Sequence, residues 1–348
     1  MRIVVNDIAA SAGGAMSVLN NFYHEVLNTS DENEWIFLLG DKYLKETSNI
    51  RIITFPDVKS SWSKRLKFEL FTGKNIINKF DPDIYLSLQN TVTLGVNCKK
   101  FVYIHQVLPF QKEKNFSFFK KSERIYAIYQ KFIGGIIRYT VKKSKADIIV
   151  QSKWLKRIFA EEFPSNNTTT VSPKISHLGN IKREDNQGDN YFFYPASDLL
   201  YKNHKLIYQA VDILEKKGFQ NFKVILTINS PKNFIDNKNK YVFLGKIDKE
   251  DVWKYYMKST LIFPSYIESY GLPLKEAKMC GSAIFASKTE FSKEILENYP
   301  NSFFFDVSDA EELATLMEKK ITKELDLTKE YMAEDSQENS LLSTIIFK

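Results

Sequence analysis

The stretch FPSYIESYGLPLKEAKMCGSAIFAS (263–287) carries the clearest structural signal in this chain. Its apolar start predicts the end of a buried strand, Gly271 allows a tight turn, and Pro273 suits the first turn of a helix. A helix that begins directly behind a strand presents its first backbone N–H groups and the positive end of its dipole, and both favour a bound anion. We therefore expect a phosphorylated ligand beside residues 269–274.

Two glutamates flank this turn. Glu268 lies in the loop before the helix, and Glu276 lies about one turn inside it, where a carboxylate can accept hydrogen bonds from two neighbouring hydroxyl groups. A sugar nucleotide offers both phosphates and vicinal hydroxyls. Two glutamates at this spacing also occur by accident in charged chains, so the surrounding pattern has to decide between the two interpretations.

The order strand, Pro-Ser, Glu, Gly-Leu-Pro, Glu-Ala, followed by Gly281 and another apolar run, closely resembles the nucleotide-sugar signature of the family-4 retaining glycosyltransferases with the GT-B fold. The resemblance implies an α/β protein with two doubly wound, Rossmann-like domains that face a central cleft. It also implies that Glu268 holds the donor sugar, that Glu276 holds the ribose, and that Gly271 and Leu272 belong to the diphosphate site.

The length and composition fit this expectation. A chain of 348 residues exceeds what one hydrophobic core usually serves, and 43% apolar residues are enough for two cores. No apolar run approaches the roughly 18 residues of a membrane span. The start MRIVVNDIAAS is broken too soon by Asn6 and Asp7 for a signal peptide. These features predict a cytoplasmic protein.

Short apolar runs alternate with helical patterns along most of the chain, which is typical of parallel sheets covered by helices. The predicted strands are 2–5, 35–39, 50–55, 83–88, 100–105 and 146–150, then 191–196, 223–229, 241–245, 260–265, 282–286 and 302–305. The predicted helices are 15–28, 62–79 and 117–143, then 204–216, 249–258, 272–280, 290–297 and 309–321. The polar stretch 179–190 is the best candidate for a linker.

These patterns predict an acceptor-side domain over 1–182 and a nucleotide-sugar-binding domain over 183–330. By the resemblance, the last segment, 331–348, forms a helix that returns toward the first domain. Doubly wound sheets bind ligands outside the carboxyl ends of their strands, so we expect the reaction site in a cleft between the two domains.

The first domain contributes three candidate residues. Gly13 and Gly14 precede a predicted helix, where a backbone without side chains can approach a diphosphate closely, although the dinucleotide fingerprint G-x-G-x-x-G is absent. His105 ends a predicted strand, where a lone histidine is often a core or capping residue. Its position nevertheless matches the histidine that the resembling enzymes place close to the reacting sugar.

The second domain contributes further donor contacts. Lys202 matches the lysine of the Lys-Asn segment that, in the resembling enzymes, binds the donor diphosphate as a point charge. Many members also carry a glycine and an arginine shortly after the preceding strand, but this chain has Ser197 and Asp198 there, so one expected cation is missing. Gly245 to Ile247 are expected to line the base through backbone contacts.

We expect no metal cofactor. Asp81-Pro82-Asp83 is the one D-x-D sequence of the chain, and transferases with the alternative GT-A fold hold Mn or Mg through such a pair at the end of a strand. Here the aspartates precede a predicted strand and Pro82 suits a surface turn. The two cysteines and four histidines have no metal-ligand spacing.

The positive charge is concentrated in residues 110–145. This segment holds ten Lys and Arg against two Glu, a local balance of 10 − 2 = +8 in a chain of formal charge +7. Three phenylalanines fall in a loop flanked by lysines: Phe116, Phe118 and Phe119. Exposed aromatic residues in a basic loop fit an anionic membrane surface. No nucleic-acid-binding fold is readable, so nucleic acid is not expected as a partner.

An apolar stripe follows this loop at helical spacing. It consists of Ile125, Ile128, Phe132, Ile136 and Tyr139. A stripe of this kind on a helix of an α/β domain usually faces the core, and that is the orientation we expect here.

Together these observations predict a retaining glycosyltransferase that moves a sugar from a UDP- or GDP-sugar to a lipid-linked or oligosaccharide acceptor in cell-surface polysaccharide biosynthesis. It would work at the inner face of the cell membrane, with Glu268, His105 and Lys202 at the reacting groups. A sugar-nucleotide 2-epimerase of the same architecture is one alternative. A catalytically silent subunit of a glycan assembly complex is another, suggested by Asp198 where a cation is expected.

Overall fold

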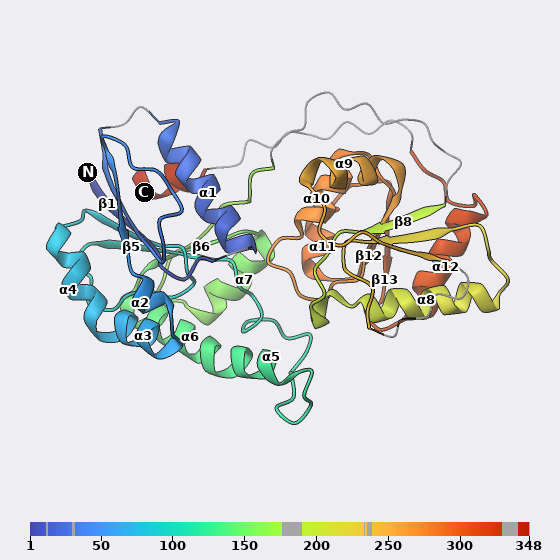
Figure 1. The fold of residues 1–348 in the computed structure, drawn as a ribbon, viewed down its shortest axis with the longest axis horizontal. Coiled ribbons are helices and arrows are strands. Elements are labelled where there is room, and N and C mark those ends of the chain that lie inside the picture. The colour runs from blue at the N-terminus through green and yellow to red at the C-terminus, as the bar shows by residue number, and fades with distance from the viewer. Residues whose placement is uncertain are drawn as a thin grey trace. The chain divides into compact units, whose positions relative to one another are not determined.

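The computed structural model describes residues 1–11, 13–29, 32–175, 190–232, 234, 239–328 and 340–347. The chain forms two compact units, which are Met1–Lys174 with Gln337–Lys348, and Ile175–Ser336 (Figure 1). The domain boundaries predicted at 182 and 330, and the linker predicted at 179–190 except for its last residue, lie outside the described residues.

Unit 1 is built on a seven-stranded, wholly parallel sheet in the order β3-β2-β1-β4-β5-β6-β7. Its strands are β1 (Arg2–Asp7), β2 (Glu34–Leu39), β3 (Ile50–Thr54), β4 (Ile84–Ser87), β5 (Lys99–Ile104), β6 (Asp147–Val150) and β7 (Thr168–Thr170). The sequence predicts the first six of these strands. It misses β7, because three threonines at the edge of a sheet form no apolar run.

Helices cover both faces of this sheet (Figure 1). They are α1 (Gly13–Leu27), α2 (Pro56–Lys59), α3 (Trp62–Lys67), η1 (Phe68–Thr72), α4 (Gly73–Ile77), η2 (Asn78–Phe80), α5 (Arg124–Ile128), η3 (Tyr129–Ile133), α6 (Gly134–Ser144), α7 (Lys153–Glu162) and α13 (Leu341–Ile346). The apolar residues of α13 join the core that α1 forms with β1 and β2. The Leu342 backbone N–H also donates to Glu25 of α1 at 3.2 Å.

The helix predicted over 117–143 begins only at Arg124, because side chains hold the preceding segment in a loop. Gln111 bonds the backbone N–H and carbonyl of Lys114, and Gln130 accepts from the Phe116 N–H at 3.1 Å. Phe116 is buried and stacks on Tyr126 with ring centroids 5.1 Å apart, so its expected exposure is wrong.

The expected orientation of the apolar stripe is also wrong. The buried face of the continuous helix α5–η3–α6 consists mainly of other residues, which are Ala127, Gln130, Gly134, Ile137, Thr140 and Val141. A Cβ on Gly134 would lie 2.6 Å from Cβ of Pro109, so the helix approaches its unit closely here. Ile125, Phe132 and Tyr139 therefore point to solvent.

Unit 2 is built on a six-stranded parallel sheet in the order β10-β9-β8-β11-β12-β13. Its strands are β8 (Tyr191–Tyr194), β9 (Lys223–Leu226), β10 (Tyr241–Phe243), β11 (Thr260–Phe263), β12 (Ile284–Ser287) and β13 (Ser302–Phe305). Its helices are η4 (Leu200–Lys202), α8 (His204–Lys216), α9 (Lys249–Lys258), α10 (Leu272–Met279), α11 (Glu290–Ile295) and α12 (Ala310–Ile321). Each unit is thus a doubly wound α/β sheet, as predicted.

Within the described part of the chain, no helix combines the length and the apolar character needed to cross a membrane.

Candidate functional site

The strand order of unit 2 places its topological switch point between β8 and β11. From β8 the chain continues to β9 on one side, whereas from β11 it continues to β12 on the other. Loops that leave two such strands diverge and open a crevice at their carboxyl ends, where doubly wound sheets bind ligands. Lys202 follows β8 and Glu268 follows β11, so both lie in the loops of this switch point.

Lys202 and Glu268 meet directly. The Nζ atom of Lys202 lies 2.5 Å from Oε1 of Glu268, and the two side chains are only 16% and 15% exposed. The ion pair fixes a cation at the end of η4, in a loop from 195 to 203 whose only other charged residue is Asp198. A lysine held in this way offers a point charge to a phosphate group.

A buried tyrosine joins the two loops beneath this ion pair. The Tyr194 hydroxyl donates to the backbone carbonyl of Lys202 at 2.9 Å, and its oxygen lies 2.9 Å from Oγ of Ser265. Asn203, in the left-handed region at φ 59°, donates its side-chain N–H to the Pro264 carbonyl at 3.3 Å. No sequence pattern singles out Tyr194, because the last residue of a buried strand looks like any other core residue.

The turn at Gly271 has the backbone geometry that the sequence predicts. Gly271 caps α10 at φ 95°, and a Cβ there would lie 3.2 Å from the Leu274 side chain. Leu272 and Pro273 occupy the first helical positions. The first N–H groups of a helix have no partner within the helix, and its dipole is positive at this end. The start of α10 is therefore suited to an anion.

Glu276 is held by a residue that the sequence reading missed. The hydroxyl of Tyr256, a buried residue of α9, donates to Oε2 of Glu276 at 3.0 Å. Burial raises the pKa of Glu276, and the hydrogen bond from Tyr256 and the charge of Lys249 limit the rise. One carboxylate oxygen is thus fixed by Tyr256.

Gly245 and Ile247 follow β10, the edge strand that lies two positions from β8 in the sheet. Gly245 adopts φ 65° and its N–H donates to the Ile228 carbonyl at 3.2 Å. Ile247 is half-buried in the segment before α9. Both residues thus lie at the carboxyl ends of the strands, in the loop after β10, whereas Lys202 and Glu268 lie in the loops after β8 and β11.

The other three predicted residues belong to unit 1. His105 follows β5, and its backbone N–H and that of Gln106 donate to Oδ1 of Asn90 at 2.9 and 3.0 Å. Burial lowers the pKa of His105 to about 4, so its ring is neutral at physiological pH. Gly13 and Gly14 begin α1, Gly13 at φ 61°, and a Cβ on either would meet no atom within 4 Å.

Unit 1 also contains two buried carboxyl groups that the sequence reading did not single out. Asp7 ends β1, and burial raises its pKa to about 7. Burial likewise raises the pKa of Glu69 in η1 to about 7, while its carboxylate accepts hydrogen bonds from Gln89 and Thr93. Because Gln89 in turn accepts from the Ala9 N–H at 3.0 Å, Glu69 supports the start of the loop that leads to Gly13.

The D-x-D aspartates lie at the opposite end of the sheet from the carboxyl ends of its strands. Asp81 adopts φ 47°, and Oδ2 of Asp83 accepts from the Arg2 N–H at 2.7 Å where β1 begins. Asp83 thus has a structural partner at the amino ends of β1 and β4.

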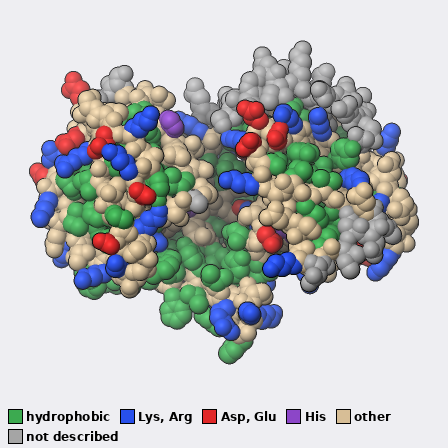
Figure 2. Space-filling model, in the orientation of Figure 1, with side chains coloured by type: hydrophobic (Ala, Val, Ile, Leu, Met, Phe, Trp, Pro, Cys, Tyr) green, Lys and Arg blue, Asp and Glu red, His purple; other side chains and the backbone are tan. Residues whose placement is uncertain are grey.

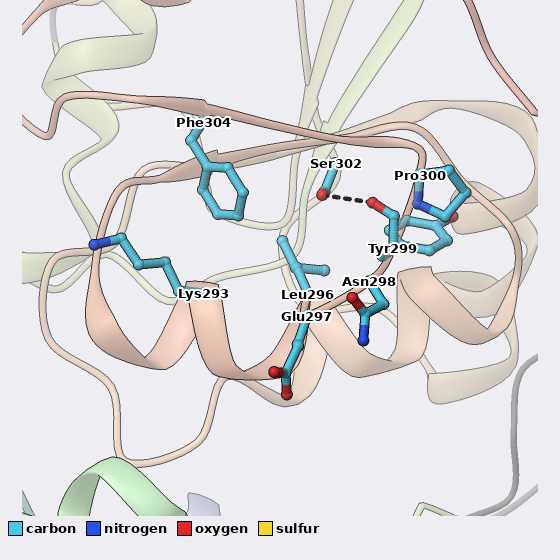
Figure 3. Close-up of a pocket in the computed structure, with 8 residues that line it drawn as sticks. All are labelled: Lys293, Leu296, Glu297, Asn298, Tyr299, Pro300, Ser302 and Phe304. Atoms are coloured by element: carbon cyan, nitrogen blue, oxygen red, sulfur yellow. Dashed lines mark hydrogen bonds between the residues drawn. The ribbon is translucent and has the colours of Figure 1, made fainter.

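A separate hollow in unit 2 involves none of the predicted residues. It measures about 510 Å³ and lies between α11 and the amino end of β13, as Figure 3 shows. Its lining consists of Lys293, Leu296, Glu297, Asn298, Tyr299, Pro300, Ser302 and Phe304. Since ligands bind at the carboxyl ends of such sheets, this hollow does not compete with the switch point as a donor site.

Comparison with known families identifies the second unit. Residues 180–339 match the family model for glycosyl transferases group 1. This chain carries a group 1 glycosyl transferase domain. The predicted group 1 glycosyl transferase type is thereby confirmed for this part of the chain.

This glycosyl transferase domain has curated relatives in bacteria. The serotype-specific mannosyltransferase WbdA of Escherichia coli is 22% identical over 218 residues, which are 59% of this chain and 25% of WbdA. The chain therefore spans about a quarter of the length of the curated relatives it matches.

Solved structures similar to this protein cover nearly the whole chain. Sucrose-phosphate synthase from Thermosynechococcus elongatus is 14% identical with a TM-score of 0.65, covering 92% of this chain and 90% of its own. The lipopolysaccharide outer core galactosyltransferase WaaB is 14% identical with a TM-score of 0.64, covering 94% and 92%. Anabaena HepE, solved with UDP-glucose, is 13% identical with a TM-score of 0.63, covering 93% and 90%. The predicted GT-B fold class is confirmed.

Proposed function

We propose that this protein transfers a sugar, with retention of the anomeric configuration, from a UDP- or GDP-sugar to a lipid-linked glycan in cell-surface polysaccharide biosynthesis. The observation that carries the proposal is the partly buried Lys202–Glu268 ion pair at the switch point of a group 1 glycosyl transferase domain. It supplies a cation for the diphosphate and a carboxylate for the hydroxyl groups of the sugar.

The same unit offers groups for the rest of the donor. The start of α10, opened by Gly271 and Leu272, suits the diphosphate, and Glu276 suits the ribose hydroxyls. Gly245 and Ile247 would line the base. The solved complex of HepE with UDP-glucose supports a nucleotide-sugar donor.

The proposed reaction breaks the bond between the anomeric carbon and the diphosphate oxygen and forms a bond from that carbon to the acceptor oxygen. The proton of the acceptor hydroxyl passes to the departing diphosphate on the same face of the sugar, which gives retention. Lys202 and the start of α10 stabilise the charge that develops on the diphosphate. Neutral His105 would hydrogen-bond the reacting sugar, and Gly13 and Gly14 would let the unit 1 backbone approach the phosphates.

We further propose that transfer needs no metal, because Lys202 supplies the positive charge that a metal would otherwise bring. The position of Asp81 and Asp83 at the amino end of β4 supports this view. The relatives favour a polysaccharide acceptor, since their names include a serotype-specific mannosyltransferase and a lipopolysaccharide outer core galactosyltransferase. We also propose that the protein works at the cytoplasmic face of the membrane, which an acceptor of this kind and the basic segment 110–145 support.

A donor screen followed by product analysis tests the proposal. Thermal shifts with UDP-, GDP- and ADP-sugars identify the donor, and NMR of the product formed with acceptor lipid reports the anomeric configuration. The variant Lys202→Met should lose turnover. An inverted product would contradict retention, a new sugar formed from donor alone would indicate an epimerase, and nucleotide binding without turnover would indicate a silent subunit.

A further inference from the structure

Unit 1 carries an exposed apolar surface, hereafter the apolar face. It consists of Trp62, Phe118, Phe119, Ile125, Ile128 and Phe132. Phe119 is 95% exposed, Ile125 71% and Phe132 65%. Figure 2 shows hydrophobic side chains gathered around α5, with Lys and Arg side chains beside them. Soluble proteins rarely expose so many large apolar side chains together unless the surface binds something.

Specific contacts between side chains hold the apolar face in place. The rings of Phe118 and Phe132 meet edge to face with centroids 6.3 Å apart, and those of Trp62 and Tyr129 at 6.5 Å. The opposite side of the helix is anchored, since Arg138 donates to Glu162 at 2.7 Å and to the Pro109 carbonyl at 2.8 Å. With its other side fixed in this way, the helix keeps the stripe turned outward.

Along residues 114–145, the exposed charges beside the apolar face are of one sign. Lys121, Arg124 and Lys131 are exposed beside it. Glu123 is the only acidic residue between positions 114 and 145. Its buried carboxylate accepts from the Ser117 N–H and forms ion pairs with Lys114 and Lys120. The outward surface of this helix is therefore apolar and cationic. This combination complements an anionic lipid surface, where apolar side chains enter the acyl boundary and the cations meet headgroups.

We propose that the apolar face of α5–η3–α6, with Trp62 and the 118–119 loop, inserts into the surface of an anionic membrane. This inference deepens the proposed function, and it rests on that function because the proposed acceptor is lipid-linked. The relevant partner is a bilayer with phosphate headgroups rather than free phosphate, because isolated phosphate offers no surface for Phe119 and Ile125.

Vesicle binding of the full chain tests this inference. Sedimentation with vesicles of equal parts phosphatidylcholine and phosphatidylglycerol should recover the protein, whereas pure phosphatidylcholine and soluble phosphatidylglycerol headgroup should not bind it. Ile125→Gln with Phe132→Gln should weaken binding at least tenfold. Lys121→Gln with Lys131→Gln should weaken it about 25-fold, since each cation contributes roughly fivefold. Added salt should release the wild type.

The matched control is Leu27→Gln with Phe347→Gln, two exposed apolar residues of unit 1 outside the apolar face. It should bind vesicles like the wild type, and all variants should keep the same nucleotide affinity. Equal binding to neutral vesicles, or equal loss in the control, would overturn the inference. The inference would also be overturned if the protein bound no vesicles and instead formed a dimer that the Ile125/Phe132 variant dissociates. Vesicle binding without nucleotide binding would instead refute the proposed function and leave the membrane face intact.

Discussion

The hydroxyl of Tyr256 donates to Oε2 of Glu276 across 3.0 Å, so a buried residue of α9 orients a carboxylate of α10. A carboxylate has more acceptor positions than one donor fills, and the remaining ones can accept from two vicinal hydroxyls. Tyr256 is itself buried in its unit, and its backbone carbonyl accepts from Oγ of Ser282 at 2.5 Å. The proposed contact of Glu276 with the ribose would use these remaining acceptor positions.

Removing the hydroxyl of Tyr256 should weaken the binding of ribonucleotides selectively. For Tyr256→Phe we expect a loss of about 0.5–1.5 kcal/mol, and for Glu276→Ala about 1–3 kcal/mol, since hydrogen bonds to a charged group are lost. Calorimetry with the preferred nucleotide and its 2′,3′-dideoxy analogue measures both. The analogue should bind wild type and variants alike. Tyr255→Phe on the same helix is the control, and an equal loss for the dideoxy analogue would show a merely structural role.

Neutralising Lys202 should weaken binding of the diphosphate but not of the nucleoside. Lys202→Met with Glu268→Gln removes both charges, so neither partner stays buried without the other. We expect the affinity for the nucleoside diphosphate to fall by about 1.5–3 kcal/mol. Glu268→Gln alone should lower kcat more than it changes nucleotide affinity, because its carboxylate would contact the donor sugar. An unchanged diphosphate affinity in the double variant would remove Lys202 from the donor site.

Turnover should persist in excess EDTA. In the proposed mechanism the charge on the departing diphosphate is met by Lys202 and the start of α10, and no step uses a divalent ion. Initial rates with and without chelator, followed by added Mn or Mg, measure this. Loss of activity that Mn or Mg restores would contradict the metal-independent mechanism.

Glu69 should make unit 1 less stable as the pH rises. Its pKa is raised from 4.5 to about 7, so between these values the folded state keeps a proton that the unfolded state has lost, and folding stability falls until the folded group also ionises. Between pH 4.5 and 8 this loss should be on the order of 3 kcal/mol. Glu69→Gln cannot ionise and should lack this contribution, so its stability should fall less steeply with pH, with the similar contribution of Asp7 remaining.

Denaturant unfolding of the wild type and Glu69→Gln at several pH values measures the difference between them. The exposed Glu161→Gln serves as the control, because it should show the same slope as the wild type. Parallel slopes for the wild type and Glu69→Gln would mean that Glu69 ionises in its ordinary range.

The sequence by itself determined most of the secondary structure and the turn at Gly271. Short continuous apolar runs predicted twelve of the thirteen strands that the described residues form, because burial on both faces of a parallel sheet leaves a local signal. Gly271 and Pro273 marked the start of α10, because a left-handed turn and a helical N-terminus each favour particular residues at one position. These features depend only on a few neighbouring residues.

Only the tertiary structure decided which side chains meet and which face outward. Lys202 and Glu268 are 66 positions apart and Tyr256 and Glu276 are 20 apart, and both pairs depend on strand order and helix packing, which periodicity does not encode. The stripe at 125–139 faces solvent, because Gly134 and Ala127 let the other side of the helix approach its unit more closely. A hydrophobic pattern indicates that a helix has an apolar face, and the packing of the helix decides whether that face lies against the core or toward solvent.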